Sequence, residues 1–76
     1  MTMADVKTAT KVTTIRRGKY LVEVPITVVY SPEAPEEPII QADTARLLDE
    51  IARHAEAGDV AWLKQHGKVY ELIEAT

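Results

Sequence analysis

An apolar residue at every second position of residues 19–30 constrains the fold of this chain more than any other feature. Every second residue from position 20 is apolar: Tyr20, Val22, Val24, Ile26, Val28 and Tyr30. Successive side chains of a strand point to opposite faces, so this spacing predicts a β-strand with one buried face. Such a strand needs a neighbouring strand and a layer that covers its apolar face.

The residues before this strand supply the neighbour. Residues 6–16 are rich in valine and threonine, and Arg16-Arg17-Gly18-Lys19 provides the glycine of a tight turn. We therefore predict an antiparallel hairpin over residues 5–30.

The register of this hairpin stays open between two alternatives. A three-residue loop places Val12 opposite Val22 and satisfies the core, whereas a four-residue loop pairs Ile15 with Tyr20. Pro25 has no backbone N–H, and only the second register puts it at a position without a ladder hydrogen bond. In either case we expect a bulge or a strand end near Pro25.

Residues 31–40 carry a proline at every third position, with glutamates between them: Pro32, Glu33, Pro35, Glu36, Glu37 and Pro38. Polyproline II has three residues per turn, so the prolines would share one edge. We predict a stiff acidic connection from the strand to a following helix. A proline-rich docking ligand is the alternative, but the glutamates would be repelled by the acidic grooves that commonly bind such ligands.

A helix is predicted over residues 43–57, with Asp43 as its N-cap and Gly58 at its end. Its apolar side chains form one stripe: Ala45, Leu47, Leu48, Ile51, Ala52 and Ala55. On the opposite face we expect two ion pairs at i,i+4 spacing, Arg46 with Glu50 and Asp49 with Arg53.

The last third of the chain predicts a short helix over residues 59–66, with Trp62 as a core side chain, and then a strand over residues 68–74. A helix remains the alternative for residues 68–74, because Val69, Leu72 and Ile73 are also spaced for one face of a helix. The complete pattern predicts one α+β domain over residues 1–76, in the order ββααβ, with a small antiparallel sheet packed by two helices.

The length and composition indicate a small soluble domain. A chain of 76 residues with no cysteine has neither a disulfide nor a thiolate metal cluster to supplement its core. We expect a cytoplasmic protein without a membrane span, since no long apolar stretch is present. The small core and an unpaired strand edge make a homodimer through strands one possible assembly.

The net charge of −3 hides a strong polarity. Residues 1–31 carry five basic and two acidic residues, whereas residues 32–76 carry four basic and ten acidic ones. The basic residues are most concentrated at the hairpin tip, where we predict that Arg16, Arg17 and Lys19 contact a protein partner. Contact of this tip with nucleic acid is the alternative, which the acidic remainder of the chain disfavours.

Two histidines are the remaining candidates for chemistry. Glu50 and His54 have the i,i+4 spacing of two ligands to one metal, but only Asp43 is available as a third. We therefore expect His54 to pair with Glu50, and His66 to have a structural role at a helix end. With no phosphate loop or nucleophile motif, we predict no cofactor and no enzyme, and rank a metal- or histidine-dependent enzyme last. The favoured function is a noncatalytic protein-interaction, regulatory or accessory module.

Overall fold

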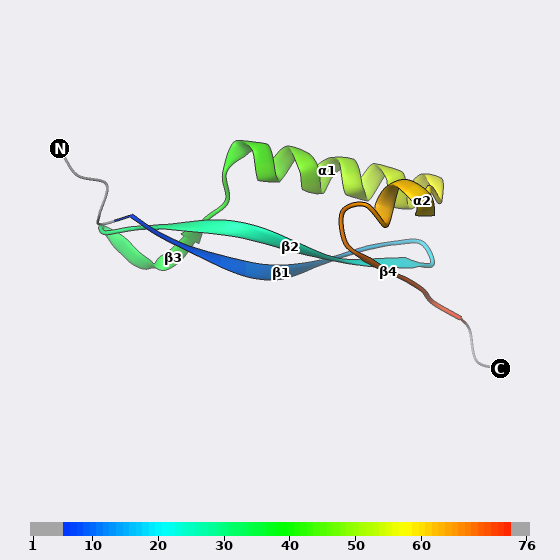
Figure 1. Cartoon of the computed structure of the whole chain (residues 1–76), viewed down its shortest axis with the longest axis horizontal. Helices are drawn as coiled ribbons and strands as arrows, with labels where there is room; N and C mark the ends of the chain where they lie inside the picture. The colour runs from blue at the N-terminus through cyan, green and yellow to red at the C-terminus, as the bar shows by residue number, and fades with distance from the viewer. Residues whose placement is uncertain (1–5, 74–76) are drawn as a thin grey trace.

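The computed structural model describes residues 6–73 of the chain. Its elements follow in the order β1 (Lys7–Arg17), β2 (Tyr20–Ser31), β3 (Ala34–Ile39), α1 (Ala42–Ala57), α2 (Val60–Leu63) and β4 (Lys68–Glu71). The two helices lie on one side of a four-stranded antiparallel sheet (Figure 1). The predicted α+β fold is confirmed, with β3 as an additional strand.

The sheet is built around β2, which pairs with β1 along one side over its whole length. On its other side β2 pairs with two short strands placed end to end. β4 pairs with residues 20–23 and β3 with residues 29–31, so among the described residues no strand pairs with residues 24–28 on that side. The sheet is therefore three strands wide at its ends and two strands wide in the middle.

The core lies between β2 and the helices, as the alternation predicts. Its buried apolar side chains are Val22, Val24, Ile26 and Val28 of β2, Ile51, Ala52 and Ala55 of α1, and Leu63 of α2. Burying a valine, leucine or isoleucine side chain stabilises a fold by about 1.5–3 kcal/mol. A core this small makes each of these side chains important to the fold.

The hairpin register differs from both predicted alternatives. Arg17 pairs with Tyr20, so the turn contains only two residues, Gly18 and Lys19. Gly18 has φ +59, which suits the first central position of a type II′ turn and which other residues rarely adopt. The right-handed twist of the strands favours this tight turn over the longer loops that we had expected.

Pro25 lies inside β2 with no bulge in the β1–β2 ladder, contrary to the expected interruption. A two-residue turn makes Arg17–Tyr20 a hydrogen-bonded pair, and bonded and non-bonded pairs then alternate along the ladder. Pro25 faces Val12 in a non-bonded pair, and its nitrogen is directed at the side of β2 between β3 and β4. The proline therefore costs no ladder hydrogen bond.

The segment 31–40 is not the predicted polyproline connection, because residues 34–39 form strand β3. A turn at residues 32–33 reverses the chain, and Tyr30 then pairs with Pro38 after a bulge in the ladder. Tyr30 directs its backbone bonds towards β1, so its pair with Pro38 needs no N–H. Prolines are compatible with an edge strand in this arrangement. The three-residue spacing of the prolines suggested polyproline II and so concealed the strand.

Helix α1 begins one residue earlier than predicted, and the N-cap is Gln41, without a side-chain hydrogen bond. Asp43 lies within the first turn instead, where it pairs with Arg46 at 2.9 Å. The predicted pair of Arg46 with Glu50 is thus replaced, because Asp43 is also within reach and the N-terminal turn favours a carboxylate. The pair of Asp49 with Arg53 is confirmed at 3.5 Å.

The end of α1 and the start of α2 follow the predicted signals. Gly58 has φ 73 and closes α1, and Asp59 accepts a hydrogen bond from the backbone nitrogen of Trp62. α2 is shorter than expected, because residues 64–66 form turns instead of helix. The predicted strand over residues 68–74 is confirmed over Lys68–Glu71 but does not extend to residues 72–73, and residues 74–76 lie outside the described part of the chain.

Candidate functional site

Strand β1 lies at one margin of the sheet and pairs only with β2 among the described residues. In the observed register its odd-numbered residues exchange backbone hydrogen bonds with β2. The N–H and C=O groups of its even-numbered residues therefore point away from the sheet: Thr8, Thr10, Val12, Thr14 and Arg16. Eleven residues of uninterrupted strand thus present a free hydrogen-bonding edge.

The other margins of the sheet are less accessible to a new strand. The nitrogen of Pro38 in β3 points to its outer side and has no hydrogen to donate. β4 has only four residues. Of the margins formed by residues 6–73, β1 alone combines length and regular register with outward donors and acceptors along most of the strand.

The predicted tip residues Arg16, Arg17 and Lys19 lie at the turn end of β1, but they do not form one cluster. The Nζ of Lys19 lies 3.5 Å from the Oε2 of Glu71 in β4 and 5.5 Å from the ring centre of Tyr20. Arg17 donates from Nη1 to the carbonyl oxygen of Arg16 at 2.8 Å. This bond occupies one outward acceptor and places the Arg17 guanidinium beside the free edge.

Two further cations, Lys7 and Lys11, belong to the same strand. Neither lysine was predicted to contact a partner, although no acidic residue lies between Val6 and Val22. Lys7, Lys11 and Arg17 all have odd numbers, so they project from the helix side of β1, and Arg16 projects from the opposite face. None of these four cations forms an ion pair with another residue of the described chain. Two sequence signals could have identified this row of cations along β1: their odd-numbered positions on a predicted strand, and the absence of acidic residues between them.

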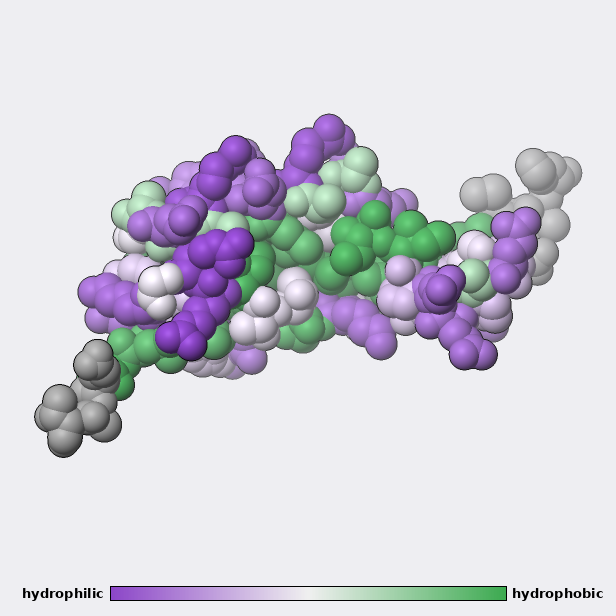
Figure 2. All heavy atoms as spheres, turned by 180° about the vertical axis from the view of Figure 1, so that it is seen from behind, coloured by the Kyte–Doolittle hydropathy of each residue, from purple (hydrophilic) through white to green (hydrophobic). Residues whose placement is uncertain are grey.

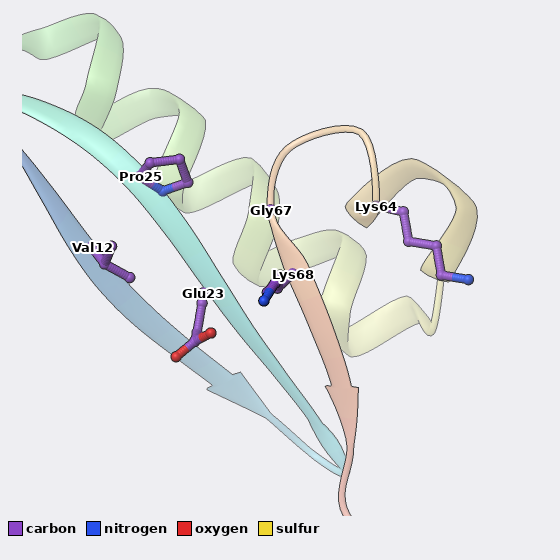
Figure 3. A pocket seen from close by; sticks show the side chains of 6 residues that line it. All are labelled: Val12, Glu23, Pro25, Lys64, Gly67 and Lys68. Atoms are coloured by element: carbon purple, nitrogen blue, oxygen red, sulfur yellow. The ribbon is translucent and has the colours of Figure 1, made fainter.

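The sheet face opposite the helices holds a shallow depression of about 510 Å³. It is lined by Val12, Glu23, Pro25, Lys64, Gly67 and Lys68, with the Lys64 side chain pointing away from the sheet (Figure 3). Val12 is 66% exposed here, whereas one predicted register had placed it in the core. Figure 2 shows that apolar surface also reaches solvent along the middle of one side of the molecule.

One titratable group in this region is perturbed. The hydroxyl of Tyr70 in β4 donates to Oε1 of Glu23 at 2.8 Å. This hydrogen bond raises the pKa of Tyr70 above its usual value of 10.0, with further contributions from slight desolvation and from the negative charge of Glu23. The pair joins β4 to β2 on the open face of the sheet.

His54 does not pair with Glu50, as the sequence had suggested. Its Nδ1 lies 3.2 Å from Oδ2 of Asp59, and its ring stacks on Trp62 with a centroid distance of 3.7 Å and an interplanar angle of 6°. His66 lies on Trp62 as well, at 4.2 Å and 37°. Trp62 is half-buried against the core between these two rings. Across residues 6–73, no cluster of three or more histidine or acidic side chains is arranged to hold a metal ion.

Comparisons with known proteins found no match to the chain among protein families, curated proteins or solved structures. Within the described residues, neither helix has the length and apolar character needed to cross a membrane.

Proposed function

We propose that this chain is a noncatalytic protein-interaction module, an accessory or regulatory component that binds its partner along strand β1. The proposal rests on one observation, the free edge of an eleven-residue strand. Its unpaired N–H and C=O groups are a ready template for a strand from another chain. Recognition through such an edge uses backbone hydrogen bonds for affinity and neighbouring side chains for specificity.

The narrow sheet supports this assignment. Its middle is only two strands wide, so β1 and β2 each have one side there without a partner strand. A strand added to β1 would widen the sheet where the core is thinnest and cover the exposed side of Val12. Binding of a partner would therefore also stabilise the module by mass action.

Nucleic acid is the competing ligand class for a strand that carries Lys7, Lys11, Arg16 and Arg17. The net charge of −3, with ten acidic and four basic residues in residues 32–76, opposes the approach of a phosphate backbone. A free strand edge, by contrast, is complementary to a peptide backbone and has no counterpart in a nucleic acid. The free edge of β1 therefore favours a protein partner over a nucleic acid.

Co-purification from the native host tests the proposal with a matched pair of baits. Thr10→Pro removes one outward N–H of β1 without removing a bond to β2, and Thr10→Ala changes the side chain while it keeps the donor. A partner recovered with the wild type and with Thr10→Ala, and lost with Thr10→Pro, supports binding through the edge. Recovery of the same partners by all three baits would contradict it.

A further inference from the structure

We infer that the β1 edge receives an extended acidic segment of a partner protein as an additional strand, with acidic side chains spaced four residues apart. This inference rests on the proposed function and specifies the chemistry of the partner. It follows from the charge of β1, the parity of its residues and the register of the hairpin.

The outward backbone groups available to this strand run from Thr8 to Thr14, and Lys7 lies one residue before them. Arg16 lies beyond them, because its outward carbonyl already accepts a hydrogen bond from Arg17. At about 3.3 Å per residue, this stretch is about 20 Å long. A segment of this length can pair with the outward groups of Thr8, Thr10, Val12 and Thr14 without any change in the β1–β2 ladder.

The charges of β1 specify the partner's side chains. Lys7 and Lys11 are four residues apart on the same face and are both exposed. Directly opposed residues of neighbouring strands have Cβ atoms about 4.5–5.5 Å apart, and opposite charges at such positions stabilise the pair. The partner is therefore expected to place an acidic residue opposite each lysine.

The residues between the cations complete the pattern. Ala9 lies between Lys7 and Lys11 on the same face, and it leaves room for a large β-branched side chain on the partner. The sequence that fits is Glu-x-Val-x-Glu, or the same with aspartate or isoleucine. This pattern reads the same in both directions, so it does not depend on whether the added strand is parallel or antiparallel.

A second copy of the chain fits this edge poorly where the two β1 strands overlap fully or centre on Lys11. Two β1 strands that overlap fully around a two-fold axis at Val12 place Lys7 directly opposite Arg17 at both ends. A shift that centres the axis on Lys11 places the two lysines opposite each other. Like charges at opposed positions destabilise a pair of strands, and lysine on an edge commonly prevents self-pairing. In these two registers the same cations that attract an acidic segment oppose a dimer.

The test is a titration of the ¹⁵N-labelled chain with the peptide Val-Thr-Glu-Thr-Val-Thr-Glu. Three probes are matched to it: the same peptide N-methylated at alternate residues, a glutamate-to-glutamine version, and a single-stranded oligonucleotide of equal charge. The inference expects shifts confined to β1 and adjacent residues, and at least about tenfold weaker binding of the first two matched probes, which is about 1.4 kcal/mol each.

The same peptide is also titrated against variants of the chain. Thr10→Pro and Lys11→Glu are expected to weaken peptide binding at least about tenfold, and Thr10→Ala less than about twofold. Equal binding of the N-methylated peptide or of the oligonucleotide would show attraction by charge alone and overturn the inference. Self-association that protects the same β1 amides without peptide would assign the edge to a second copy, which also overturns it.

The outcome separates this inference from the function that it rests on. If no acidic peptide binds, yet the Thr10→Pro bait loses a native partner, the strand chemistry assigned here is wrong and the interaction module stands. If the peptide does not bind and all three baits recover the same partners, both the inference and the proposed function are wrong.

Discussion

At the scale of single residues, close backbone approach constrains the chain most at Gly67. A Cβ atom on Gly67 would collide with the carbonyl oxygen and carbon of Glu23 in β2. Gly18 differs, because a Cβ there would meet nothing within 4 Å although its φ of +59 is unfavourable for other residues. The first glycine is required by packing and the second by backbone conformation.

Replacement of each glycine by alanine separates these two effects. Gly67→Ala is expected to reduce the free energy of unfolding by about 2–3 kcal/mol, because β4 must move away from β2. Gly18→Ala should cost only about 1–2 kcal/mol, the strain of the left-handed conformation. Chemical denaturation followed by circular dichroism measures both, and equal losses would refute the close approach of Gly67.

The hydrogen bond from Tyr70 to Glu23 makes stability depend on alkaline pH. The bond requires the protonated phenol, so the pKa of Tyr70 is higher in the folded than in the unfolded chain. Its contribution is therefore complete below the usual pKa of 10.0 and is lost as the pH rises through the raised folded value.

Tyr70→Phe should accordingly be less stable than the wild type at neutral pH, and this difference should shrink as the phenol of the wild type ionises. Glu23→Ala should lower the pKa of Tyr70, which the ring resonances of Tyr70 report in an NMR titration. A Tyr70 pKa that is unchanged by Glu23→Ala would show that another interaction causes the shift.

At the scale of elements, α2 depends on one carboxylate with two partners. Oδ1 of Asp59 accepts from the backbone nitrogen of Trp62 at 3.3 Å, and Oδ2 lies 3.2 Å from Nδ1 of His54. The second contact holds the ring that stacks on Trp62. Asp59 thereby connects the start of α2 to the end of α1.

Asp59→Ala is expected to destabilise the fold by about 1 kcal/mol or somewhat more, because the cap and the histidine contact are both lost. Asp59→Asn keeps the cap and should cost less than half as much. Thermal unfolding monitored by Trp62 fluorescence measures the difference, and equally large losses would assign the effect to the carboxylate charge instead of the cap.

The elements also show which parts of the fold the sequence could predict. The alternation from Tyr20 to Tyr30 identified β2 and its buried face, and the apolar stripe with Gly58 identified α1 to within a residue or two. β3 could not be predicted, because the prolines at 35 and 38 disfavour a strand unless its outer edge is unpaired. That condition depends on the position of β3 in the sheet.

The candidate site was predicted only in part for a similar reason. The tip cations were visible as a run in the sequence, whereas the row that includes Lys7 and Lys11 depends on the hairpin register. That register is set by a two-residue turn at Gly18, and both loops considered from the sequence were longer. His54 likewise pairs with Asp59, a residue that reaches it only because Gly58 reverses the chain.

At the scale of the whole molecule, the fold is asymmetric about β2. The helices cover one face, β3 and β4 occupy one side, and β1 leaves the other side open (Figure 1). Lys7, Lys11, Arg16 and Arg17 lie along this open side, while six of the acidic residues belong to β3 and α1. The free backbone edge and the positive charges thus lie on the same margin of the sheet, strand β1.

Charge reversal at the tip tests how far the contact extends along this margin. Arg16→Glu and Arg17→Glu reverse the charge of residues at the end of the free edge. Lys19→Glu removes a cation that is already paired with Glu71. We expect the two arginine variants to weaken capture of the partner more than Lys19→Glu does. An unchanged recovery of every partner by all three variants would exclude the tip from the contact.

The most direct test of the free β1 edge is residue-resolved amide hydrogen exchange of the isolated chain. The amides of Ala9, Lys11 and Thr13 bond to β2 and should exchange slowly, whereas those of Thr8, Thr10, Val12 and Thr14 should exchange rapidly. This alternation along β1 is the result that the structure predicts. Uniform protection of all these amides in the monomer would mean that the edge is already covered, and it would contradict the account.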